Sequence, residues 1–351
     1  MNLPTNHFKC ELSADVAQTF LSAGSRDIPV PCSSTAFNGR LENRPHPQTG
    51  KSALRTRRAF SLVELLVVMS LLSLIVLALM QVFSSTQRAF RASVTQTDVM
   101  EGGRAAVDLI GNDLRLMAAS GGVSNALSFN PPPPVNLSLE GNFGYDNTYR
   151  PLYQSLPGGA DVRTNLLNAI FILTRENTTW TGIGYYVDYS SASSLYPLYR
   201  FYATTNIQNN PGALRRAFYN AIVNNHATGV WTNMSHIIDG VVHLTVHAYN
   251  ANGSWLRYDY PYQPQNIFFS SPPAYHEAQL YFFGNTLPVS VELEFAKLED
   301  RAVKRAESLP NNLPALPPLD RRSLYLNDQS GNVHIFRQHI SIPNADRAAY
   351  Q

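Results

Sequence analysis

One uninterrupted apolar run near the N-terminus limits what this chain can fold into. Residues Phe60 to Phe83 contain a single ionisable side chain, that of Glu64. A helix gains 1.5 Å per residue, so this run would be about 36 Å long, enough to cross a hydrocarbon core of roughly 30 Å. The run therefore predicts one membrane-spanning helix over residues 60–83.

Basic residues are concentrated on one side of this run. Lys51, Arg55, Arg57 and Arg58 precede it, and the first basic residue after it is Arg88. Positively charged flanks stay in the cytoplasm. We therefore expect a single-pass protein of the inner membrane, with a cytoplasmic N-terminus and a periplasmic C-terminal part.

The composition indicates a folded chain and excludes two classes of protein. Hydrophobic residues make up 44% of the 351 residues, which is enough for a core. The net charge is only +2, and the body of the chain has no Lys/Arg block, so we expect no nucleic-acid partner. Cysteine occurs only as Cys10 and Cys32, which excludes a disulfide scaffold or a Cys-based zinc module in the rest of the chain.

Three interpretations of the apolar run compete. It is longer than the 7–15-residue core of a secretory signal peptide, and no A-x-A-like cleavage site follows it. A plain signal anchor fits the length, but it leaves Glu64 unexplained, because an acid at mid-membrane costs about 2.5–3.5 kcal/mol. The third interpretation gives this acid a partner.

The sequence RRAFSLVELL, residues 57–66, resembles the class III signal of type IV prepilins and pseudopilins. In that family a prepilin peptidase cuts just before the apolar run, the new N-terminal Phe is N-methylated, and the acid pairs with the amine of a neighbouring subunit. The resemblance implies cleavage between Ala59 and Phe60, methylation of Phe60, and an inter-subunit salt bridge from Glu64. Ala59 departs from the usual Gly at its position.

The resemblance extends more weakly along the chain. Residues 104–115 are similar to the second helix half of J-type minor pseudopilins of type II secretion and of W-type minor pilins, and the size resembles prepilin-like proteins of Verru_Chthon cassettes. This implies a pilin-like α+β fold, in which a long N-terminal helix packs on an antiparallel β-sheet head. It also implies as partners prepilin peptidase, other pilins or pseudopilins, the inner-membrane assembly platform and membrane lipid.

The first 59 residues form a Pro- and Ser-rich leader without sustained periodicity. We expect this leader to be disordered, and either cleaved or the product of a start site placed too far upstream. A mature chain of residues 60–351 would contain no cysteine, as suits an exported protein that does not rely on disulfides.

The helical pattern continues past the membrane run. Residues 84–119 lack proline and carry apolar residues at three- and four-residue steps, which predicts an amphipathic continuation of the helix. Gly102-Gly103 marks either a kink or a point of close packing. We expect the helix to stop at Ser120-Gly121-Gly122.

Residues 120–351 predict a periplasmic β-rich head. Residues 123–165 have a loop-like composition, with a polyproline run at 131–134. Runs rich in apolar and aromatic residues predict strands over 169–174, 183–189, 198–203 and 333–342, and alternating apolar and polar residues predict strands over 241–249 and 287–295. Residues 213–223 are expected to form a short helix. The Pro/Asn-rich segments 123–165, 257–286 and 299–330 are interpreted as insertions that enlarge the head.

No arrangement of residues in the head predicts catalysis. His243 and His247 are four apart, but they lie on a strand, about 13 Å apart, which favours solvated strand histidines over a metal site. We find no catalytic or cofactor motif and expect no metal, no cofactor and no enzyme activity.

The sequence therefore favours a minor pilin-like or pseudopilin subunit of a type II secretion pseudopilus or a related filament. Two alternatives stay open. One is a type IV pilus minor pilin used for adhesion, motility or DNA uptake. The other is a signal-anchored periplasmic binding protein or enzyme.

Overall fold

The computed structural model describes residues 61–121, 133–141, 151–159, 161–190, 194–257, 266–269, 279–309 and 321–346. The chain divides into two units, residues 1–65 and 66–351. Of the first unit only residues 61–65 are described, and they contain the start of helix α1 (Leu62–Arg115). The predicted leader lies outside the described residues.

Helix α1 is a single element of 54 residues that passes from the apolar run into the head without a break. Its side chains are exposed from Leu62 to Val94, and the first buried one is Val99. The helix ends at Arg115, four residues before the predicted end at 119. It ends there because Met117 forms an antiparallel bridge with Thr174, and the Ala118 N–H donates to the Leu173 carbonyl over 2.9 Å.

The main sheet of the head has seven antiparallel strands in the order β7-β6-β5-β4-β1-β10-β9. A tight turn with Asn177 in the left-handed region joins β4 and β5, as expected of a hairpin. The strands span β1 Val135–Gly141, β4 Asn168–Glu176, β5 Thr179–Val187, β6 Leu198–Asn206, β7 Met234–Ile238, β9 Ile267–Phe269 and β10 Leu280–Phe283.

A second antiparallel sheet has three strands in the order β12-β11-β8, and a short hairpin β2-β3 stands apart from both sheets. These elements are β2 Leu152–Ser155, β3 Val162–Asn165, β8 Val241–Tyr249, β11 Ser290–Leu298 and β12 Val333–Ser341. The remaining helices are α2 Gly212–Thr228, α3 Asp300–Glu307 and α4 Arg321–Asn327. The predicted α+β class, a long helix followed by an antiparallel β-rich region, is confirmed.

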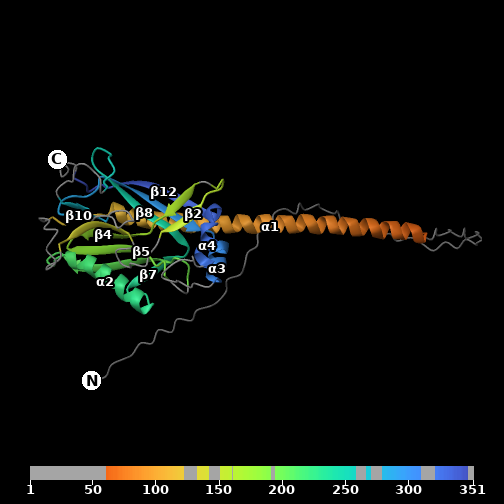
Figure 1. The fold of residues 1–351 in the computed structure, drawn as a ribbon, viewed down its shortest axis with the longest axis horizontal. Helices are drawn as coiled ribbons and strands as arrows, with labels where there is room; N and C mark the ends of the chain where they lie inside the picture. The colour runs from red at the N-terminus through yellow and green to blue at the C-terminus, as the bar shows by residue number, and fades with distance from the viewer. Residues whose placement is uncertain are drawn as a thin grey trace, which may run out of the picture. The chain divides into compact units, whose positions relative to one another are not determined.

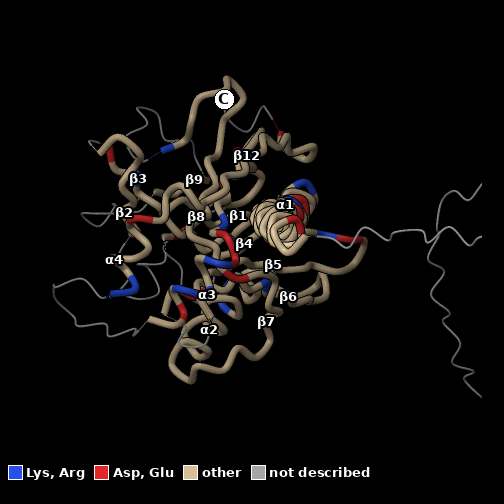
Figure 2. The backbone as a smooth tube through the Cα atoms, turned by 90° about the vertical axis from the view of Figure 1, so that its right-hand side faces the viewer, with Lys and Arg blue, Asp and Glu red and all other residues tan. Residues whose placement is uncertain are grey.

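The seven-stranded sheet lies between α1 and α2 (Figure 1). It separates two cores, one with residues of α1 and one with residues of α2, so its central strands are buried on both faces. Ile170 and Ile172 of β4 face α1 and the three-stranded sheet. Phe171 and Leu173, which alternate with them, face α2 on the other side. Figure 2, which looks along α1, shows the helix lying between β12 and the strands β5 and β6. One side of α1 therefore faces the three-stranded sheet, and another side faces the seven-stranded sheet.

Three segments interpreted as loops or insertions contain regular structure instead. Residues 123–165 include β1, which pairs with both β4 and β10 in the middle of the sheet, and also β2 and β3. The polyproline run ends directly before β1, whose Leu137 and Leu139 alternate into the core. Residues 257–286 supply β9 and β10, and residues 299–330 supply α3 and α4. Strands β2, β3, β9 and β10 have only three or four residues, too few for a periodic signal. Strand β1 does alternate apolar and polar residues, so that signal was present and the loop-like composition around it hid the strand.

Three glycines let the strands approach α1 closely. A Cβ added at Gly103 would overlap the ring of Phe336 on β12, and one at Gly102 would lie 2.9 Å from Ile238 Cδ1 on β7. A Cβ at Gly111 would lie 2.7 Å from Gln338 Oε1. Because α1 continues through all three positions, Gly102-Gly103 is a point of close packing and does not end the helix.

Replacing Gly103 by Val is expected to destabilise the head by about 1–3 kcal/mol, because the new side chain displaces Phe336 from a packed site. Unfolding of the detergent-solubilised protein by urea measures this change. The control is Ala105→Val on the exposed side of the same helix, which costs only helix propensity. An equal loss of stability in both variants would contradict the close-packing interpretation.

Candidate functional site

The predicted processing residues lie at the start of α1. Ala59 and Phe60 are outside the described residues, and Glu64 is the third residue of the helix. Ser61 caps the helix: its Oγ accepts the Glu64 N–H over 3.2 Å, and its carbonyl accepts the Leu65 N–H over 3.2 Å. Ser-x-x-Glu before an apolar run is a sequence pattern typical of a helix N-terminus. Glu64 was interpreted only as part of the processing signal, and the cap at Ser61 was not predicted.

The apolar part of α1 presents hydrophobic side chains in every direction. Residues from Leu62 to Phe83 are exposed, and Glu64 forms no ion pair with any described residue. This helix is long and apolar enough to cross a membrane, and none of its most apolar stretch is buried within the protein. Such a surface requires lipid or other helices around it.

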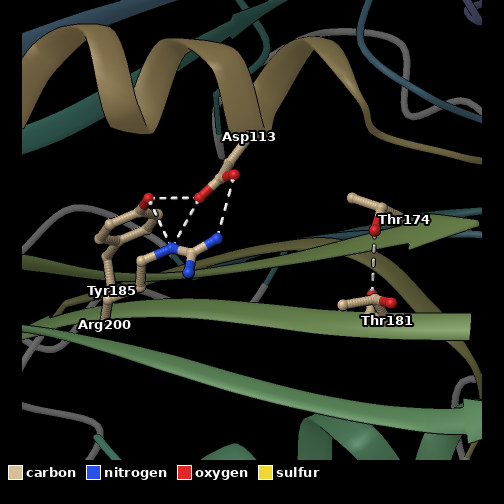
Figure 3. A network of polar contacts seen from close by, with 5 residues as sticks. All are labelled: Asp113, Thr174, Thr181, Tyr185 and Arg200. Carbon is tan, nitrogen blue, oxygen red and sulfur yellow. Dashed lines mark hydrogen bonds and ion pairs between the residues drawn. The ribbon is translucent and has the colours of Figure 1, made fainter. Parts of the chain in front are cut away.

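The far end of α1 is tied to the head by a buried carboxylate. Asp113 receives two hydrogen bonds from Arg200 on β6, with 2.9 Å between Nε and Oδ2 and 3.2 Å between Nη2 and Oδ1. The Tyr185 hydroxyl on β5 also donates to Oδ2 (Figure 3). The Arg200 Nε lies 3.2 Å from the same hydroxyl oxygen, which closes the network. We call these three residues the anchor of α1.

Burial shapes the ionisation of the anchor. The pKa of Tyr185 is raised, first by burial and then by the Asp113 charge, so its hydroxyl stays a donor. Burial by itself would lower the pKa of Arg200, but the hydrogen bonds and charge of Asp113 raise it overall. A paired guanidinium and a protonated tyrosine satisfy the carboxylate that α1 brings into the core.

His243 on β8 differs from the predicted solvated histidine. Its Nδ1 accepts the Leu166 N–H over 3.0 Å, its Nε2 lies 3.1 Å from Thr245 Oγ1, and its side chain is only 15% exposed. Burial, followed by the charge of Arg163, lowers the pKa of His243 to about 4. The imidazole is therefore neutral and holds the chain before β4 against β8. His247 contacts the edge of Trp255, with ring centroids 4.8 Å apart.

One hollow in the head has charged residues in its lining, and several of them pair with one another. A hollow of about 360 Å³ beside β7 and α3 is lined by charged residues, yet Lys297 pairs with Asp300 and His236 pairs with Asp239. Among the described residues, no group of three or more His, Cys, Asp or Glu could hold a metal ion.

A comparison with protein-family models gives a match that covers the start of α1. The family model described as the prokaryotic N-terminal methylation motif matches residues 54–80. This span contains the Ala59–Phe60 bond, the Ser61 cap and Glu64, so the chain carries a type IV prepilin-like motif on an apolar helix. Comparison with curated proteins and with solved structures found no match.

Asp113→Asn is expected to lower the stability of the head by about 3 kcal/mol, because Arg200 then keeps its charge without a carboxylate. We place the loss at the low end for a buried pair, since the Arg200 side chain is 23% exposed. Urea unfolding measures it. Asp108→Asn, on the exposed side of α1, is the control and should change stability by less than about 0.5 kcal/mol.

Stability is expected to fall between about pH 6.5 and pH 4. The pKa of His243 lies below that of an unfolded histidine, so neutral His243 stabilises the fold above pH 6.5, and acid removes this contribution. The loss is on the order of 2 kcal/mol. In His243→Gln, unfolding curves recorded across this range should depend less on pH, whereas the exposed His339→Gln should behave as the wild type.

Proposed function

We propose that this chain is a minor pilin-like or pseudopilin subunit that prepilin peptidase processes and that assembles into a type II secretion pseudopilus or a related filament. The observation that carries the proposal is the methylation-motif match at residues 54–80, which coincides with the capped start of an apolar helix. The motif implies processing by prepilin peptidase and assembly with other pilins.

In this proposal the subunit acts by assembly. The exposed apolar part of α1 first lies in the inner membrane and then among the helices of other subunits. Glu64 pairs there with the methylated amine of Phe60 from a neighbour, because a buried carboxylate and a buried ammonium each need an opposite charge. Apolar packing allows helices to slide along each other, so this ion pair sets their axial offset.

The basic residues before the run support a cytoplasmic N-terminus, with the head in the periplasm in contact with the assembly platform and partner subunits. In this proposal the chain is not an enzyme. Among the described residues that line the hollow beside β7 and α3, the two acids other than Glu307 and the histidine form ion pairs, and Glu307 accepts the Leu195 N–H, so no set of unpaired acids or histidines converges there. A signal-anchored binding protein or enzyme is the alternative from a different class.

Within the filament class, the J-type resemblance at residues 104–115 favours type II secretion. In the structure this segment carries Asp113 and the side of α1 that packs in the head. A minor pilin of a type IV pilus, used in adhesion, motility or DNA uptake, has the same requirements for its helix and is the alternative.

Mass spectrometry of the mature N-terminus tests the proposal directly. In cells that also express a prepilin peptidase, the chain should begin at N-methylated Phe60, and an inactive peptidase should leave it uncut. An uncut chain in both cells would favour a plain membrane anchor, and Ala59→Gly would then show whether the alanine blocks the cut.

Glu64→Gln is expected to be cut and inserted into the membrane as the wild type is, but to recover at least several-fold less partner pilin on co-purification. The amide keeps the size of the side chain and loses the charge that pairs with the amine. Asp108→Asn, which removes an exposed charge elsewhere on α1, is the matched control. Equal recovery from Glu64→Gln and wild type would contradict the role of Glu64.

A further inference from the structure

The stretch of α1 between the apolar run and the head carries two basic residues and no acid. Between Glu64 and Asp98, the only charged residues are Arg88 and Arg91. Both are exposed, and neither forms an ion pair with another described residue. At 100° and 1.5 Å per residue, they lie about 60° apart around the helix axis and about 4.5 Å apart along it. One side of the helix therefore carries two cations that no neighbouring acid balances.

Aromatic side chains lie beside the two arginines. Phe83 is 64% exposed and Phe90 is 69% exposed. With Arg91 they line a hollow of about 290 Å³ on the surface of the helix, whose other lining residues are Thr86 and Gln87. The side chains of Gln87 and Arg91 donate to no described residue. The hollow thus combines apolar walls with hydrogen-bond donors that lack an acceptor within the described part of the chain.

These side chains lie at the level of the lipid headgroups when the apolar run spans the membrane. Arg88 is about 7.5 Å beyond Phe83 along the helix axis, and Arg91 is about 12 Å beyond it. The headgroup region extends roughly 5–8 Å past the hydrocarbon core on each side. Helical side chains are inclined toward the N-terminus, which here is the direction of the membrane, so both guanidinium groups reach back to the headgroups. The Phe90 ring is inclined in the same direction.

We propose that Arg88 and Arg91 bind the phosphate of an anionic phospholipid in the leaflet nearest the head, with Gln87 as a further donor and the rings of Phe83 and Phe90 against the apolar part of that lipid. A guanidinium matches a phosphate with two parallel hydrogen bonds. Two unbalanced cations favour a lipid of net negative charge over a zwitterionic one. A bound headgroup resists sliding of α1 through the bilayer and so fixes the height of the head above it. The inference rests on the membrane insertion that the proposed function includes.

Site-specific photo-cross-linking measures the lipid preference. The photoreactive residue p-benzoylphenylalanine replaces Ser84, which lies one turn before Arg88 on the same side of α1. The full, unprocessed chain is reconstituted into vesicles that contain equal amounts of phosphatidylglycerol and phosphatidylcholine. Each basic residue near an anionic surface contributes roughly a fivefold preference, so cross-links to phosphatidylglycerol should be at least about fivefold more abundant. The basic leader is the same in all samples and faces the opposite leaflet.

Charge variants connect the preference to the two arginines. Arg88→Gln combined with Arg91→Gln should lower the ratio of the two cross-linked lipids to about one. Arg104→Gln combined with Arg115→Gln removes the same charge from exposed positions farther along α1 and should leave the ratio as in the wild type. Arg88→Lys combined with Arg91→Lys keeps the charge and should keep a preference of at least about twofold. NaCl at about 1 M, where the Debye length is about 3 Å, should lower the preference of the wild type.

Two further samples test whether a lipid occupies this one side of the helix. A photoreactive residue in place of Val82, about half a turn away from Ser84 at nearly the same depth, should show little preference. Inorganic phosphate added at constant ionic strength should not compete, because it has no apolar part to contact the two rings. The inference is overturned by equal ratios for the wild type and the double glutamine variant, by an equal preference at position 82, by a loss of preference in the control at positions 104 and 115, or by competition from inorganic phosphate.

Mass spectrometry of the N-terminus in cells separates this inference from the proposed function. The vesicle experiment uses the uncut chain, so its outcome does not depend on processing. A chain that is cut at Phe60 in cells but shows no lipid preference refutes the headgroup site and leaves the proposed function standing. A chain that stays uncut but shows the preference refutes the processing and leaves the headgroup site standing.

Discussion

The buried Asp113 carboxylate fixes how the helix and the head fit together. A carboxylate in a core must be neutralised where it lies, so Arg200 and Tyr185 determine which strands face α1. Helix α2 has the reverse arrangement on the opposite face of the sheet. There Arg215 lies 2.8 Å from the buried Glu140 of β1 and stacks on the Tyr281 ring. Each helix is thus positioned by one ion pair and one tyrosine, and apolar contacts fill the remaining space.

Hydrophobic patterns were sufficient to predict the elements in which such a pattern continues over many residues. The continuation of the apolar run as a helix and the strands β4, β5, β8 and β11 are present near their expected positions. The anchor could not be predicted, because Tyr185 and Arg200 are 72 and 87 residues from Asp113 along the sequence. Local patterns carry no information about such pairs. Likewise, β1 is a central strand only because β4 and β10 lie on either side of it.

The two parts of helix α1 lie in different environments, and their sequences differ accordingly. Its first part is apolar on all sides with exposed side chains, while its second part has a buried side with glycines at 103 and 111. The glycines cost helix stability in isolation, since each is about 1 kcal/mol less favourable than alanine. Close packing against Phe336 and Gln338 offsets this cost only when the head is folded. The second part of the helix and the head therefore depend on each other for stability.

The cap at Ser61 has a consequence for the order of events in biogenesis. Two hydrogen bonds of the first turn of α1 are accepted by Ser61, which lies downstream of the Ala59–Phe60 bond. In the proposed pathway, hydrolysis of that bond thus removes no hydrogen bond of the described first turn. In that pathway the mature subunit keeps both hydrogen bonds that Ser61 accepts, so processing and assembly act on the same capped start of the helix.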